Sequence, residues 1–96
     1  MSLLPDAEID AALADLPGWR RDGGALRTDL RFRDFAEAFG MATRVALLAE
    51  KRNHHPDLRV GWGRLGIALT SHDAGGITRR DTDMARAIAE WTRSKD

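Results

Sequence analysis

Hydrophobic residues recur at the three- and four-residue spacing of a helix face in three parts of the chain. The first part is residues 5–16, where Pro5 suits the first turn of a helix because that position needs no amide hydrogen bond. Pro17 and Gly18 then end the pattern. The predicted inward face of this first helix is Ile9, Ala12, Leu13 and Leu16.

The second and longest helical pattern runs from Asp34 to about Asn53. Asp34 can accept a hydrogen bond as the N-cap residue, and Glu37, three residues later, can complete a capping box. Because residues before a proline are disfavoured in the helical conformation, Pro56 predicts an end near Asn53 or His54. The predicted inward face is Phe35, Ala38, Phe39, Ala42, Val45, Ala46 and Ala49.

The third helical pattern follows Thr78, a residue type that suits the N-cap position. Its predicted inward face is Met84, Ala85, Ile88 and Trp91. Asp81 falls on the same side of this helix by its spacing from these residues, whereas Asp83, about 200° further round, should face solvent. The pattern therefore places one carboxylate at the head of an apolar helix face.

Alternation of apolar and polar residues predicts short strands between the helices. A short extended piece begins at Trp19, and Asp22-Gly23-Gly24 supplies a turn before a strand over residues 25–32. The apolar positions later change parity across Gly61-Trp62-Gly63, which predicts two strands joined by a tight turn or, alternatively, one strand with a bulge. The order helix, strand, strand, helix, strand, strand, helix is typical of an α+β fold with an antiparallel sheet and helices on one face.

Composition narrows the class of protein. The 96 residues make a single domain over 1–96, and the absence of cysteine excludes disulfides and thiolate chemistry. Fifteen basic and fifteen acidic residues balance, which argues against direct binding to nucleic acid or a membrane surface. Neither a signal peptide nor an apolar run of membrane-spanning length is present, so we expect a soluble, cytoplasmic protein.

One motif matches a known pattern in its letters but not in its context. Residues 61–66, GWGRLG, have the glycine spacing of the dinucleotide-binding motif G-x-G-x-x-G. That motif opens a helix after a strand, whereas the alternating Leu65, Ile67 and Leu69 predict a strand here. We therefore assign these glycines to a turn.

Two of the three histidines are adjacent. His54 and His55 follow the second predicted helix and precede Pro56, which fixes the direction of the backbone. Imidazole exchanges protons near neutral pH, so the pair is a candidate for general acid–base catalysis; the alternative is two polar residues that merely stabilise a helix C-terminus. His72 lies in the loop after the fourth strand, which the predicted sheet can bring back beside this corner.

Two acidic residues are candidate partners of the histidines. Asp81 could orient a histidine or hold a polar ring, although Thr78 and Asp81 also fit a capping box. Glu50, four residues before His54, could act in the site or pair with nearby arginines on the surface. A zinc site is a further alternative, but neither the H-x₃₋₅-H nor the H-E-x-x-H spacing is present, so we expect no metal.

Taken together, these motifs resemble those of a known family. The segments AEKRNHHPD at 49–57 and TSHDAGGITRRD at 70–81, with LPGW at 16–19, are similar to the pterin-4a-carbinolamine dehydratases, also known as the dimerisation cofactor of a homeodomain transcription factor. The resemblance implies a four-stranded antiparallel sheet with three helices on one face, in homodimers or homotetramers. It implies dehydration of 4a-hydroxytetrahydropterin to quinonoid dihydropterin, which recycles the pterin after aromatic amino-acid hydroxylation. The pterin is then the substrate, and no cofactor is expected.

The resemblance also carries over the residues of the site. The family's catalytic residues match His54, His55, His72 and Asp81. Its substrate-binding residues match Glu50, His54, His55, Pro56, Ser71, His72, Asp73 and Ala74. Leu58 departs from the family, which usually has an aromatic residue there. The expected partners are a pterin, further copies of the chain and an aromatic amino-acid hydroxylase of the same pathway; the alternative function is a non-catalytic module that stabilises another protein's oligomer.

Overall fold

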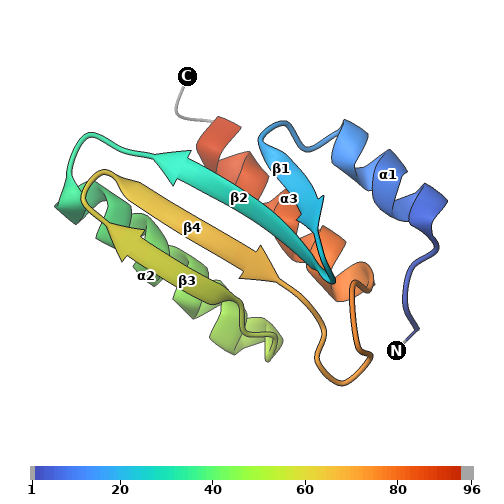
Figure 1. Cartoon of the computed structure of the whole chain (residues 1–96). Helices are drawn as coiled ribbons and strands as arrows, with labels where there is room; N and C mark the ends of the chain where they lie inside the picture. The colour runs from blue at the N-terminus through green and yellow to red at the C-terminus, as the bar shows by residue number, and fades with distance from the viewer. Residues whose placement is uncertain (1, 94–96) are drawn as a thin grey trace.

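Three helices lie on one face of a four-stranded antiparallel sheet (Figure 1). The structure, a computed structural model, describes residues 2–93. The helices are α1 (Asp6–Ala14), α2 (Phe35–Arg52) and α3 (Arg79–Arg93). The strands are β1 (Trp19–Asp22), β2 (Ala25–Arg31), β3 (Asp57–Gly61) and β4 (Arg64–Leu69). The predicted α+β class and the predicted order of elements are confirmed.

The sheet is built from two hairpins that pair with each other through their second strands. The strand order is β1-β2-β4-β3, so β1 and β3 are the edges, and Arg31 on β2 lies directly opposite Arg64 on β4. Trp62 and Gly63 connect β3 to β4, and Gly63 has a φ of 67°, a left-handed conformation that glycine adopts readily. The prediction of two strands joined by a tight turn is confirmed, and GWGRLG shapes this hairpin instead of opening a helix.

The core lies between the helices and the inward side of the sheet. The buried strand residues follow the predicted alternation: Leu26, Thr28, Leu65, Ile67 and Leu69. The helices contribute the buried residues Ile9, Val45, Met84, Ala85 and Ile88 to the same cluster. The opposite side of the sheet carries charged side chains, so the sheet has one dry face and one solvated face.

The start of α1 differs by one position from the expectation. Pro5 is the N-cap residue, with an extended backbone at φ −62° and ψ 151°, so it lies just before the helix and not in its first turn. The neighbouring Leu4 donates its amide hydrogen to the carbonyl oxygen of Ile77 at 3.0 Å. This hydrogen bond holds the incoming chain extended against the segment before α3, which explains why the helix begins only at Asp6.

The inward face of α2 is rotated relative to the predicted one. Phe35 and Phe39 are 48% and 53% exposed, and Ala46 is exposed too, so their assignment to the core was wrong. The buried residues of α2 are Ala38, Met41, Ala42, Val45 and Ala49. Helix α2 packs against β3 and β4, and Met41 belongs to the core cluster. The aromatic residues therefore lie on the flank of the helix. There the two rings contact each other, with centroids 5.8 Å apart.

Candidate active site

The end of α2 sends the two adjacent histidines into different surroundings. Asn53 adopts the left-handed conformation, with φ 50° and ψ 43°, and its amide donates to the carbonyl oxygen of Glu50 at 3.2 Å. The amide of His54 donates to the carbonyl oxygen of Ala49 at 3.1 Å. These two bonds make up a Schellman motif, which reverses the chain at a helix C-terminus. The reversal buries His54 and leaves His55 exposed.

His54 forms a buried pair with Asp81. Its Nε2 atom lies 2.6 Å from Oδ1 of Asp81, and the side chains are only 8% and 0% exposed. An ionised carboxylate only accepts hydrogen bonds, so with Asp81 ionised Nε2 of His54 is the donor. The sequence placed Asp81 on the inward face of α3, and the structure shows the histidine that it contacts.

Asp81 is also the centre of a wider hydrogen-bond network. Its Oδ2 atom accepts from Oγ of Ser71 and from the amide of Thr78, each at 2.9 Å. Oγ of Ser71 and Oγ1 of Thr78 are 2.8 Å apart. The capping interaction at the start of α3 and the contact with a histidine are therefore both present, and one carboxylate serves both.

His55 has a carboxylate partner of its own on the surface. Its Nε2 atom lies 2.9 Å from Oε1 of Glu50, and the two side chains are 54% and 77% exposed. Glu50 is thus a surface acid, but among residues 2–93 its ion pair is with His55 and with none of the nearby arginines. Pro56 follows directly and is half-buried.

The third histidine lies in a short, tightly bonded loop between β4 and α3. The amide of Ser71 donates to the carbonyl oxygen of Gly76 at 2.8 Å, which closes the loop. His72 is exposed; its carbonyl oxygen accepts from the amide of Gly75 at 3.2 Å, whereas its side chain has no hydrogen-bond or ion-pair partner within residues 2–93. Ala74 is half-buried in the same loop. Because Ser71 bonds to Asp81, this loop is tied to the His54 corner, as the predicted sheet required.

An ion pair fixes the other side of this loop. Nη2 of Arg80 donates to Oδ1 of Asp73 at 2.6 Å. This hydrogen bond, together with the positive charge of Arg80, holds the pKa of the Asp73 carboxyl below its ordinary value. Nε of Arg80 is buried and has no hydrogen-bond partner among the residues that the structure describes. Sequence reasoning missed Arg80, although its position directly before Asp81 was a usable signal.

A hollow of about 510 Å³ opens beside His54 between the end of α2 and the first turns of α3. Its lining includes Arg52, His54, Arg80, Asp83, Met84 and Arg86. Asp83 is exposed as predicted, and it contributes to the rim of this hollow. His55 and His72 do not line the hollow but face solvent. The site thus combines one buried histidine at a hollow with two accessible histidines.

Residues 2–93 lack the features of two other kinds of site. No group of three or more histidine, aspartate or glutamate side chains there could hold a metal ion. In the same range, no helix has the length and apolar character that crossing a membrane requires.

Sequence comparisons with known proteins identify a family that this chain matches. Residues 2–91 match the family model described as pterin 4 alpha carbinolamine dehydratase. A relative from Novosphingobium aromaticivorans is 52% identical over 90 residues, covering 92% of this chain and 94% of that protein. One from Mycobacterium avium is 48% identical over 88 residues, covering 92% of this chain and 94% of that protein. Both are named for the same family.

Two solved structures share the fold of this chain. The crystal structure of a transcriptional coactivator/pterin dehydratase from Brucella melitensis superposes with a TM-score of 0.88 at 34% identity, covering 93% of this chain and 97% of that chain. A pterin dehydratase-like protein identified as a RuBisCO assembly factor shares the fold, with a TM-score of 0.64 at 21% identity over 76% of this chain and 87% of that one. The sequence relatives and the family model together show that this chain belongs to the pterin-4a-carbinolamine dehydratase family.

Proposed function

We propose that this protein dehydrates a 4a-hydroxytetrahydropterin to the quinonoid dihydropterin and water by general acid–base catalysis, and so recycles a pterin cofactor. The observation that carries the proposal is the buried His54–Asp81 pair, which is bonded through Ser71 to the loop of His72. Membership of the dehydratase family supports the reaction type. The three histidines supply groups that exchange protons near neutral pH.

The reaction requires two proton transfers. One proton goes to the 4a-hydroxyl group, so that the C4a–O bond breaks and water leaves. The other leaves N5, and the electron pair of that N–H bond forms the C4a=N5 double bond. A positioned acid or base contributes about 10²–10⁴-fold to the rate of such a step. Imidazoles suffice for this chemistry, and no electron transfer or covalent intermediate is involved.

The candidate residues differ in solvent exposure, and we assign their roles accordingly. His55 and His72 are accessible, so each can exchange a proton directly with a bound pterin. His54 presents its edge to the hollow, and Asp81 fixes which of its ring nitrogens is free. Glu50 holds the ring of His55 through the contact between Oε1 and Nε2. The pterin then lies against the surface of Pro56, Asp73 and Ala74, between the corner and the loop.

An assay with enzymatically generated carbinolamine tests the proposal. The purified protein should accelerate the loss of the 4a-hydroxyl, and a chelator should leave the rate unchanged. His72→Ala should lower turnover by about 10²-fold or more while the melting temperature stays near that of the wild type, because the exposed imidazole of His72 makes no hydrogen bond or ion pair within residues 2–93. Equal loss of turnover and stability would identify a structural histidine, and an inactive wild-type protein would refute the proposed reaction.

A second role, as an oligomer-forming module, is favoured by the exposed flank of α2. Phe35, Phe39 and Leu47 are 48%, 53% and 68% exposed on this helix. We propose that a second copy of the chain covers them, because two-fold symmetry lets one apolar surface meet itself and a domain of this size gains much from added burial. This gives a homodimer, or a homotetramer if the edges β1 and β3 pair as well.

Light scattering on dilute protein tests the assembly separately from catalysis. Phe39→Glu should convert the oligomer to a monomer, whereas Asp10→Lys, at an exposed position of α1 well away from this flank, should not. A wild-type monomer at micromolar concentration would refute the self-association. Replacing His54 and His55 together should abolish dehydration and leave the assembly intact.

A further inference from the structure

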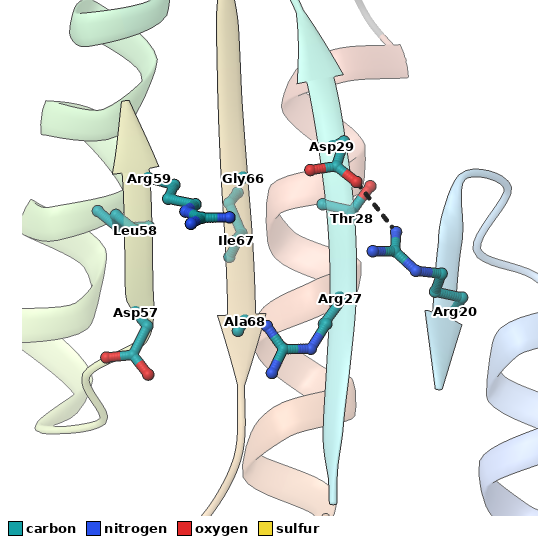
Figure 2. Close-up of a pocket in the computed structure, with 10 residues that line it drawn as sticks. All are labelled: Arg20, Arg27, Thr28, Asp29, Asp57, Leu58, Arg59, Gly66, Ile67 and Ala68. Atoms are coloured by element: carbon teal, nitrogen blue, oxygen red, sulfur yellow. Dashed lines mark hydrogen bonds and ion pairs between the residues drawn. The ribbon is translucent and has the colours of Figure 1, made fainter. Parts of the chain in front are cut away.

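The face of the sheet turned away from the helices carries charged side chains around a floor of small residues. On the central strand β4, the outward positions are occupied by Gly66 and Ala68. Figure 2 shows the longer side chains of β2 and β3 on either side of them, with Arg59 lying across Gly66. This face is separate from the His54 corner, which lies on the side of the helices.

Some of the charges on this face are paired with each other. Nη1 of Arg20 contacts Oδ2 of Asp29 at 3.1 Å, and Nε of Arg27 contacts Oδ2 of Asp22 at 3.3 Å. These pairs use the carboxylates of β1 and β2, so neither Asp29 nor Asp22 is left over for another arginine at short range.

Three further arginines on the same face have no such partner. Within residues 2–93, no carboxylate lies within 4.0 Å of the guanidinium groups of Arg31, Arg59 or Arg64. Arg31 and Arg64 stand directly opposite each other in the β2–β4 register. Like charges directly opposite in a sheet are destabilising, so this arrangement costs the free protein stability.

Two glycines let the neighbouring side chains lie close against the strand backbone. A Cβ atom at Gly66 would lie 3.2 Å from Oδ1 of Asp29 and 3.4 Å from Cβ of Arg59. A Cβ atom at Gly61 would lie only 2.7 Å from Nε of Arg64. Glycine inside a strand weakens it and often marks a site where a ligand approaches the backbone closely. Gly66 forms part of the floor of a hollow of about 500 Å³ beside these side chains.

We infer that this arginine hollow binds the phosphate group of a small phosphorylated molecule. Its lining is Asp29, Arg31, Arg59, Val60, Arg64 and Gly66. Guanidinium groups bind phosphate oxygens through paired N–H donors, and one phosphate group offers enough oxygens to bridge three of them. The volume falls within the range of about 300–1,000 Å³ that is usual for small-molecule sites. A bound phosphate group also removes the repulsion between Arg31 and Arg64.

The charge of the whole chain favours a small ligand over a polynucleotide. Fifteen basic residues are balanced by fifteen acidic ones, and the carboxylate pairs on this same face border the three arginines. A nucleic-acid backbone needs an extended basic surface, whereas a single phosphate or diphosphate group needs only a local cluster.

Calorimetric titration with pyrophosphate tests this inference on the full chain at low ionic strength. We expect one saturable site per chain, and we expect Arg59→Gln and Arg64→Gln each to weaken binding by about tenfold or more. Arg27→Gln is the matched control, because Arg27 lies on the same face but is paired with Asp22, and it should change affinity less than about twofold. Both test residues are exposed, and melting temperatures establish that the variants are folded.

Further ligands separate the possible outcomes. Inorganic phosphate and a nucleoside diphosphate are titrated in parallel. Their affinities distinguish a site for the phosphate group alone from one that also contacts an attached group. If either ligand binds the wild type and not Arg59→Gln, the inference is supported. No saturable binding of pyrophosphate, or equal binding by wild type and both variants, overturns it. Tighter binding of a single-stranded oligonucleotide with a steep salt dependence overturns it in favour of a nucleic-acid surface. Carbinolamine dehydration by Arg59→Gln should match the wild type, so this test and that of the proposed reaction fail independently.

Discussion

His54 and His55 are neighbours in the chain, and each lies within hydrogen-bond distance of a carboxylate, but the two pairs occupy opposite environments. The His54 and Asp81 side chains are 8% and 0% exposed. His54 follows the end of α2, and Asp81 lies in the first turn of α3. The His55–Glu50 pair is 54% and 77% exposed, and both residues belong to the last turn of α2 and the residues just after it. An imidazole and a carboxylate therefore form a buried junction between two helices in one case and a solvent-exposed surface pair in the other.

The difference shows that solvent exposure determines how much a histidine–carboxylate pair contributes to the stability of the fold. Removing one member of a buried pair leaves the other without a partner in a region of low dielectric, which is strongly destabilising. An exposed pair exchanges its partner for water, so its contribution to stability is small. We expect loss of the buried pair to lower both stability and turnover, and loss of the exposed pair to lower turnover alone.

Breaking the buried pair at its carboxylate should have the largest effect. Asp81→Ala removes the acceptor for His54, Ser71 and the amide of Thr78 at once, so we expect a loss of about 3–5 kcal/mol in the free energy of unfolding. Denaturant titration measures it. Asp83→Asn, an exposed position two residues further along α3, is the control and should change stability by less than about 0.5 kcal/mol. An Asp81→Ala variant as stable as this control would contradict the structural role of the pair.

The two histidines can be compared directly by the same substitution. His54→Ala leaves Asp81 without one of its donors and should cost about 1–3 kcal/mol of stability. His55→Ala removes an exposed ring and should cost less than about 0.5 kcal/mol, yet it should lower the rate of dehydration by about 10²-fold if the proposed function holds. Thermal unfolding and the carbinolamine assay, run on both variants, separate the two losses. Equal stability of the two variants would remove the distinction drawn between them.

Weakening the exposed pair sharpens the comparison from the other side. Glu50→Gln keeps the size and hydrogen-bonding capacity of the side chain but removes its charge, so stability should change by less than about 1 kcal/mol. Its effect should also shrink as salt concentration rises, because exposed charges are screened. Chemical denaturation at low and high salt checks both points. A loss as large as that of Asp81→Ala would mean that the pair is not open to solvent.

The smallest effect concerns the ion pair that holds the loop of His72. Arg80 lowers the pKa of Asp73, so the folded state favours the carboxylate. The stabilisation is therefore present at neutral pH and is lost as the pH falls through the lowered pKa, below about pH 4. Asp73→Asn should flatten this part of the acid-unfolding curve, with Asp29→Asn as the control on another exposed pair. Identical curves for Asp73→Asn and the wild type would show that the pair adds nothing.

Local patterns in the sequence predicted much of this arrangement, because they depend on neighbouring residues. The parity change at residues 61–63 identified the hairpin, the proline after the histidines set the end of α2, and helical periodicity turned Asp81 inward. Each of these features follows from steric or periodic rules that act over a few positions.

Features that depend on tertiary contacts escaped prediction. Alanines along α2 are compatible with more than one inward face, and only the packing of Met41 against the sheet decides that Phe35 and Phe39 stay outside. The separate environments of His54 and His55 follow from the left-handed backbone of Asn53, a single residue. The contact between His54 and Asp81 spans 27 positions and leaves no periodic trace.

The position of Asp81 has a consequence for the motions of the protein. Its carboxylate joins the end of α2, the loop after β4 and the start of α3. If any one of these segments opens, the buried carboxylate loses a hydrogen-bond donor. The three segments should therefore open together as one cooperative unit. The amide hydrogens of His54 and Thr78 would then exchange with solvent through the same rare opening. Their exchange rates would report, in a protein without any ligand, how much of the time the proposed catalytic corner is assembled.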